Sequence, residues 1–278
     1  MVAEKASLII QSLNLMGYDA MGVGDDDLTL GKEFLMEVSK KANFPFLSSN
    51  ILDGESGKPV FQPYLLKERN GLRIGIFSLL SPDLFSAPSD SRLKGLILQN
   101  PIETAQGIVK EIQSKADLVI LLSHLGYQKD VEFAQNVPGV HLIVGGHTGI
   151  NLSFPPVIKN TVILHSAPKG MYGGRLDLHV SNLEVGFYNT AAKRSYENNL
   201  NNLKVRLNSK EVPEAEKAQL RTTKEGIERS LQQLSGKNEF TNTISPFGEQ
   251  MKDHPDIAKL IEAYKSTFQE TAKSPPPK

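Results

Sequence analysis

Hydrophobic and polar residues follow helical and strand spacings in turn over residues 1 to about 180. The first stretch has apolar residues every three or four positions, which predicts an amphipathic helix that stops at Gly17. The next predicted elements are a short buried strand, a helix and a second strand, at residues 19–24, about 30–42 and 44–50. Residues 60–80 predict a β-hairpin, because Asn70 and Gly71 form a favoured two-residue turn between apolar runs.

Two near-continuous apolar runs, residues 117–124 and 140–147, say most about the topology. Strands that are buried on both faces have this composition in parallel sheets. The segment between the two runs is long enough for a crossover helix, so together they predict a βαβ unit. A helix is predicted before this unit and two strands after it, at residues 101–115, 160–168 and 173–180.

Beyond about Val180 the pattern changes to long polar helices with narrow apolar stripes. The stripes consist of Leu200, Leu203 and Leu207, followed by Leu220, Ile227, Leu231 and Leu234. They predict either an αα-hairpin packed on the body or a short coiled-coil contact with a partner, which includes helix-mediated self-association. The chain is thus divided into an α/β domain over 1–180 and a helical extension over 181–278, whose end at 274–278 is expected to be disordered.

Charge and cysteine content narrow the classes of function. The 31 lysines and arginines balance 31 acidic residues, so no global field favours a nucleic acid polymer or an anionic membrane. The absence of cysteine excludes disulfides, zinc–thiolate sites, iron–sulfur clusters and a cysteine nucleophile. The sequence contains no uncharged stretch of the roughly 18 residues that a membrane span requires. Its start, with Glu4 next to Lys5, also differs from the basic start of a signal peptide. From these features of the sequence, the chain is expected to be soluble and cytoplasmic.

Three predicted strands each end on a potential metal ligand, namely Asp25, His124 and His147. Ligands gather outside the carboxyl ends of parallel strands, so these side chains share one edge if the strands run parallel. Two imidazoles and a carboxylate suit Zn, Mn or Fe. Ordinary roles stay open for each residue: a histidine at a strand end can be a hydrogen-bonded core residue, and the acids at 25–27 can cap a helix.

The other histidines are weaker candidates. His165 ends a further strand and could reach the same edge, but it is not assigned to the site. His179 alternates with Arg175 and Asp177 on the predicted solvent face, so it is interpreted as a surface residue. His254 is interpreted as a turn residue before a helix.

Six segments stand in a recognisable order: "EKASLIIQSLNLMGYDAMGVGDDDLTLG", "FPFLSSNI", "RIGIFSLLSP", "DLVILLSHLG", "VHLIVGGHTG" and "NTVILHSAPKGMYGGRLDL". Over residues 1 to about 180, they resemble the calcineurin-like metallophosphatases, in the branch of bacterial 5′-nucleotidases and UDP-sugar hydrolases. The resemblance implies a partial αββα sandwich and hydrolysis of a phosphomonoester or nucleotide by a water that metal ions activate, as in nucleotide catabolism. It also implies a small phosphorylated substrate, a divalent ion (Mn, Zn, Fe or Mg) and a periplasmic location.

The resemblance assigns roles to individual residues. His124 in "SHLG" and His147 in "GGHTG" match histidine metal ligands. Asp25 falls at the metal-binding asparagine of the family motif Gly-Asn-His-Glu, and a carboxylate also binds metals. Asp26 stands at the position of the family's catalytic histidine, where an ionised carboxylate would repel phosphate. Gly149 stands where a second histidine or glutamine ligand normally follows, and the family's opening Asp-x-His and Gly-Asp motifs are absent.

Two functions therefore remain open, and a metalloprotein with unrelated chemistry is a weaker third. The first is a metal-dependent phosphoesterase of the 5′-nucleotidase type, impaired or truncated, with at most one well-formed metal site. The second is a degenerate, non-catalytic metallophosphatase-fold protein that acts as a binding or scaffold module through its helical tail. The absence of the opening motifs has two explanations: the true start of the protein lies upstream of Met1, or the protein has only half of the family's metal site. The residues after Val180 predict helices and not the family's C-terminal nucleotide-binding domain, so the pattern gives adenine or sugar specificity no support.

Overall fold

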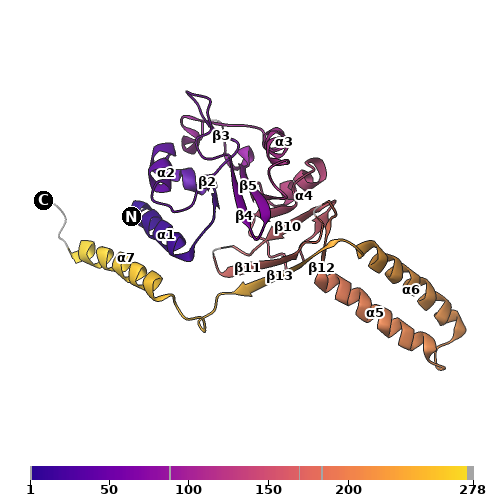
Figure 1. The fold of residues 1–278 in the computed structure, drawn as a ribbon. Coiled ribbons are helices and arrows are strands. Elements are labelled where there is room, and N and C mark those ends of the chain that lie inside the picture. The colour runs from indigo at the N-terminus through magenta and orange to yellow at the C-terminus, as the bar shows by residue number, and fades with distance from the viewer. Residues whose placement is uncertain (1, 88, 169, 183, 274–278) are drawn as a thin grey trace.

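A six-stranded sheet in the order β4-β5-β7-β8-β10-β9 is the centre of the fold (Figure 1). The computed structural model describes residues 2–87, 89–168, 170–182 and 184–273, so the predicted disorder at 274–278 lies outside the described residues. The strands of this sheet are β4 (Tyr64–Arg69), β5 (Leu72–Leu80), β7 (Leu118–His124), β8 (Leu142–Gly145), β9 (Val157–Ile158) and β10 (Thr161–His165).

The strand directions confirm two sequence predictions. β7 and β8 are parallel neighbours joined by α4 (Tyr127–Asn136), which is the predicted βαβ unit. β4 and β5 form the predicted antiparallel hairpin, in which Asn70 and Gly71 adopt positive φ angles of 52° and 78°. Such angles at both central residues are typical of the tight turn that suits the twist of two paired strands.

The two faces of the central sheet are covered by different layers. One face packs against α3 (Pro101–Ile112) and α4, and the other against a three-stranded sheet in the order β11-β13-β12. Alternate residues of β7 serve the two cores: Val119 joins the helical side, whereas Leu118 joins Phe187 and Phe240 of the smaller sheet. Burial on both faces accounts for the continuous apolar run at 117–124, and the layered α/β arrangement confirms the predicted fold class.

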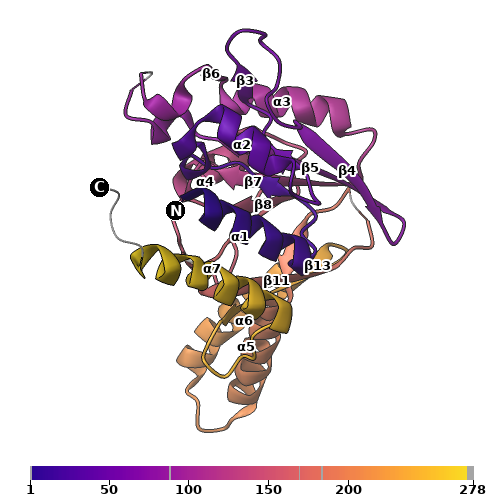
Figure 2. The ribbon, with the colours of Figure 1, turned by 90° about the vertical axis from the view of Figure 1, so that its left-hand side faces the viewer.

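The N-terminal part packs beside the carboxyl end of this sheet (Figure 2). It contains α1 (Val2–Met16), β1 (Met21–Gly22), η1 (Asp26–Leu30), α2 (Lys32–Ser39), β2 (Phe46–Leu47) and β3 (Ile51–Asp53), and β3 pairs with β6 (Leu96–Leu98). The predicted strand at 19–24 contains only the two residues of β1, which pair with β2 in a separate parallel sheet. Short turns η2 (Pro82–Leu84) and η3 (Ser91–Leu93) lie between β5 and β6.

The segment beyond Val180 differs from the prediction of helices alone. It contains β12 (Phe187–Asn189) and β13 (Asn238–Pro246), and β13 pairs with β11 (Tyr172–His179) along its whole length. In β13 only Phe240 is a buried apolar residue, because the strand exposes one face. The alternation was therefore too sparse to be recognised among polar residues.

Three helices of this segment agree with the prediction. α5 (Thr190–Asn208) and α6 (Glu214–Leu234) form an αα-hairpin that projects from the body (Figure 1), with Leu203 and Leu220 buried. α7 (Pro255–Lys273) returns to lie beside α1 (Figure 2). Among the described residues, no helix combines the length and the apolar composition that a membrane span requires.

An ion pair at the start of β5 should make the stability of the fold depend on pH. The Arg73 guanidinium donates to both carboxylate oxygens of Asp117, and these hydrogen bonds lower the pKa of Asp117 to about 2. A carboxyl group with a lowered folded-state pKa stabilises the fold above its unfolded pKa of about 3.9, and this stabilisation is lost as the pH falls toward 2. Asp117→Asn should therefore lower the melting temperature at pH 6 and have a much smaller effect near pH 2.

The control is Asp177→Asn in β11, where an exposed carboxylate accepts hydrogen bonds from Arg175 of the same strand. Exposed pairs of this kind contribute little, so this variant should melt like the wild type at both pH values. Thermal unfolding followed by circular dichroism measures both variants. An Asp117→Asn effect of equal size at pH 6 and near pH 2 would contradict the assigned pairing.

Candidate metal centre

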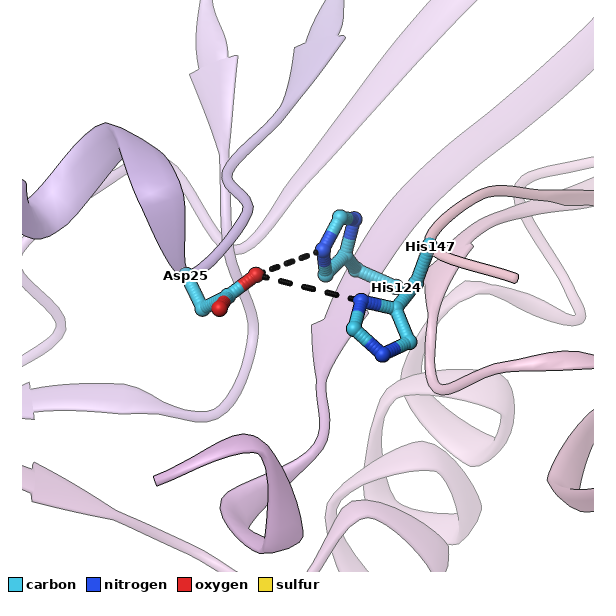
Figure 3. A group of neighbouring side chains, drawn as sticks. All are labelled: Asp25, His124 and His147. Carbon is cyan, nitrogen blue, oxygen red and sulfur yellow. Dashed lines mark hydrogen bonds and ion pairs between the residues drawn. The ribbon is translucent and has the colours of Figure 1, made fainter. Parts of the chain in front are cut away.

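The three predicted ligands converge at one point of the structure (Figure 3). Oδ1 of Asp25 lies 2.9 Å from Nε2 of His124 and 4.0 Å from Nδ1 of His147. One ligand atom from each residue can be chosen so that all three lie within 4.8 Å of one another. The structure thus brings together the three residues that were predicted to bind metal.

The route by which Asp25 reaches the site differs from the expected one. His124 ends β7 and His147 follows β8 by two residues, so parallel pairing brings these two histidines to one edge. Asp25 follows β1, which belongs to the separate two-stranded sheet and packs beside β7. Gly24 makes this close approach possible, because a Cβ atom there would lie 2.9 Å from Cε1 of His124.

The loop that carries His147 has an unusual backbone. His147 adopts φ 68°, in the left-handed region that residues other than glycine seldom occupy. Two hydrogen bonds flank it: Gly146 N–H donates to the Ser123 carbonyl, and Tyr127 N–H donates to Thr148 Oγ1. Strain of this kind persists only where surrounding contacts impose it, and it is frequent at functional sites.

The second oxygen of Asp25 contacts an arginine that sequence reasoning missed. Arg92 Nη1 donates to Asp25 Oδ2 at 2.9 Å, while the same guanidinium donates to Asp90 and lies 4.7 Å from the ring centroid of Phe85. Arg92 lies in η3, 67 positions from Asp25. No periodicity or motif marks it, so nothing in the sequence pattern could have identified it.

Two opposing effects act on the carboxylates of the acidic segment. Partial burial by itself raises the pKa of Asp25, but the hydrogen bonds and charges of His124 and Arg92 outweigh burial and hold that pKa below its ordinary value. Burial raises the pKa of Asp27 above its ordinary value, although its Oδ2 accepts a hydrogen bond from Gly24 N–H at 2.8 Å. Asp25 is therefore the group better prepared to bind a cation as a carboxylate.

Asp26 follows Asp25 in the chain but is not one of the converging group. It is exposed and lines a pocket of about 370 Å³ between α1, η1 and α2, together with Asp27 and apolar side chains. Its assignment to the position of a catalytic residue stays a prediction. Gly149, where a further ligand was missing, has φ 60°, and a Cβ atom there would lie 2.8 Å from Cβ of Pro168.

The donor atoms fit one divalent metal ion. An ion bonded at about 2.0–2.2 Å to imidazole nitrogen and carboxylate oxygen separates neighbouring ligand atoms by about 3–4 Å. The 2.9 and 4.0 Å distances from Asp25 Oδ1 agree with that spacing. Two nitrogens and one oxygen are also a donor set that transition metals accept. Asp25, His124 and His147 are the residues that would hold such an ion.

The fold defines the structural class of the chain. Sulfate thiohydrolase SoxB of Thermus thermophilus superposes with a TM-score of 0.69 at 22% identity, over 95% of this chain and 39% of the other. Calcineurin-like phosphoesterase YfkN of Bacillus subtilis superposes with a TM-score of 0.66 at 17% identity, over 98% of this chain and 78% of the other. The chain has the metallophosphatase fold.

Sequence similarity indicates the branch. A 5′-nucleotidase of Vibrio cholerae is 29% identical over 206 residues, which cover 63% of this chain and 37% of that protein. The chain therefore resembles the calcineurin-like metallophosphatases of the bacterial 5′-nucleotidase branch, as its six motifs indicated. No family model matches the chain. The aligned region spans little more than a third of the length of the Vibrio cholerae protein.

Proposed function

We propose that the chain carries the metal-binding region of a phosphoesterase of the 5′-nucleotidase type, which hydrolyses small phosphorylated substrates. The convergence of Asp25, His124 and His147 within 4.8 Å carries this proposal. The similarity to a Vibrio cholerae protein named 5′-nucleotidase supports the reaction class. Nitrogen ligands favour Mn, Zn or Fe over Mg at this position.

The residues around the candidate centre have distinct roles in this proposal. A metal ion held there would neutralise phosphate charge and lower the pKa of a bound water. Arg92 fixes one carboxylate oxygen of Asp25 and leaves Oδ1 facing His124 and His147. Without a cation, the acids at 25–27 repel a phosphate group, so phosphate binding should require the metal.

The direct test combines metal content with hydrolysis. Purified protein incubated with millimolar Mn²⁺ and then desalted should retain about one ion per chain, measured by elemental analysis. It should hydrolyse p-nitrophenyl phosphate or AMP above a protein-free control, and a chelator should stop the reaction. The control variant is His179→Ala, which removes an exposed imidazole of β11 and should change neither result.

A second candidate is a non-catalytic module that binds partners, or a second copy, through its helices. The α5–α6 hairpin favours it, because the hairpin projects from the body and exposes Val205 to 72% (Figure 1). A protein that holds metal but leaves both phosphomonoesters intact would contradict the phosphoesterase proposal and favour this module. If the purified protein retains no metal, this result would also contradict the proposed metal centre.

A further inference from the structure

A row of three residues lies directly beneath the candidate metal centre. Ser123 of β7, Gly145 of β8 and His165 of β10 stand in register at the carboxyl ends of three adjacent parallel strands. Ser123 immediately precedes His124, and Gly145 precedes His147 by two residues. Any shift in this row therefore changes the distance between the two histidine ligands.

A buried hydrogen bond between His165 and Asp130 joins this row to the neighbouring helix. Asp130, in the first turn of α4, has its Oδ2 2.7 Å from Nε2 of His165, and both side chains are 0% exposed. The other oxygen of Asp130 accepts a short hydrogen bond from Ser123 Oγ. Ser123 Oγ in turn accepts a hydrogen bond from Leu125 N–H. Asp130 thus holds β7 and β10 at the same time.

Burying the polar groups of this network in the core costs free energy. A buried carboxylate loses its hydration, and here it is compensated by an imidazole, a hydroxyl and the N-terminal end of a helix. Nδ1 of His165 is buried and has no hydrogen-bond partner among the described residues. Apolar side chains of similar volume would fill the same space without these costs. The network therefore calls for a role other than stability.

Backbone hydrogen bonds connect the network to the segments that hold both histidine ligands. His124 lies between Ser123, whose hydroxyl donates to Asp130, and Leu125, whose N–H donates to the same hydroxyl, so the backbone is held on both sides of His124. Toward His147, Gly146 N–H donates to the Ser123 carbonyl. Tyr127 packs its ring against that of His165, at 5.6 Å between centroids, and donates its N–H to Thr148.

We propose that Asp130, His165 and Ser123 form a positioning network that sets the spacing of His124 and His147. This role rests on the proposed metal-dependent function, because it concerns how the same centre is shaped. The three residues act through the backbone of β7, β8 and the loop after β8. Loss of the network should change the geometry and affinity of metal binding even in variants that remain folded.

The test uses Co²⁺ as the probe, because its visible absorption reports coordination geometry. Asp130→Asn, His165→Gln and Ser123→Ala each remove one part of the network. Each should weaken Co²⁺ binding by about tenfold or more and shift the absorption bands, when measured well below the melting temperature of each variant. Ser123→Thr keeps the hydroxyl and should restore wild-type affinity and spectrum.

The matched control is Ile163→Val, which trims a fully buried side chain of β10 two residues before His165. It should lower the melting temperature while leaving Co²⁺ affinity and spectrum unchanged. Wild-type affinity and spectrum in Ser123→Ala and in any other network variant that folds would overturn the positioning role and leave the metal centre intact. Failure of the wild-type protein to bind Co²⁺ would overturn both the metal-dependent function and the positioning role.

Discussion

Replacing His124 with alanine is expected to weaken divalent metal binding by about a hundredfold or more. His124 supplies one of three converging ligand atoms and contacts the carboxylate of a second ligand, Asp25. Loss of a residue that only supports a ligand already costs about 10–100-fold in affinity, so loss of a ligand should cost more. Titration with Mn²⁺ or Co²⁺ measures the change.

Thermal stability gives an independent measurement of the same loss. A metal at 100 times its dissociation constant stabilises the folded state by about 2.7 kcal/mol, and at a concentration equal to the dissociation constant by about 0.4 kcal/mol. A hundredfold weaker site should therefore lose most of the stabilisation by metal. Without metal, His124→Ala should melt close to the wild type, because the His124 side chain is partly exposed and belongs to none of the three hydrophobic core clusters.

Two further variants sharpen this expectation. Asp25→Asn keeps an oxygen ligand but loses its charge, so its affinity should lie between those of the wild type and His124→Ala. His179→Ala removes a histidine from the exposed face of β11 and should bind metal like the wild type. Unchanged metal binding by His124→Ala would refute the placement of the centre.

The parts of the site that the sequence predicted are those that depend on strand periodicity. His124 and His147 were predicted because long apolar runs mark strands buried on both faces, and parallel strands of one sheet end at one edge. The placement of Asp25 depends on tertiary packing, since β1 belongs to another sheet. The prediction of that placement rested mainly on the resemblance to metallophosphatases. Arg92 was not predicted, because its contact with Asp25 joins η3 to the start of η1, two short segments that no periodic pattern relates.

The fold shows the same limit of local patterns. The α5–α6 hairpin was predicted from leucine spacing, whereas β13 was missed because Phe240 is its only buried apolar residue and it pairs with β11 across the inserted hairpin. His165 was recognised as a strand-end residue that could reach the edge of the site. Its partner Asp130 could not be predicted, because one carboxylate on a polar helix gives no sign that it is buried.

Gly145→Ala is expected to destabilise the fold by about 3 kcal/mol or more. A Cβ atom at this position would overlap Nε2 of His165 and lie 2.6 Å from Oδ2 of Asp130. Neither side chain can move into solvent, because both are fully buried, and the β8 backbone is paired on both sides. Overpacking a core costs about 1–3 kcal/mol, and breaking the buried hydrogen bond between His165 and Asp130 adds to this cost. Denaturant unfolding measures the change.

Gly174→Ala in β11 is the matched control. Both glycines lie in strands outside the left-handed region, but a Cβ atom at Gly174 would meet no atom within 4 Å. The control should therefore change the free energy of unfolding by no more than about 0.5 kcal/mol. Comparable losses in the two variants would show that the cost at Gly145 comes from the glycine backbone and not from the buried pair.

A double-mutant cycle separates the clash from other effects of the substitution. In a His165→Ala background the ring that the new methyl group would overlap is absent, so Gly145→Ala should cost much less than it does in the wild type. The resulting coupling energy should exceed about 1 kcal/mol, which is within the range seen for residues in direct contact. Additive effects would mean that Gly145 and His165 do not share one tightly packed space, and the packing beneath the candidate centre would have to be reassigned.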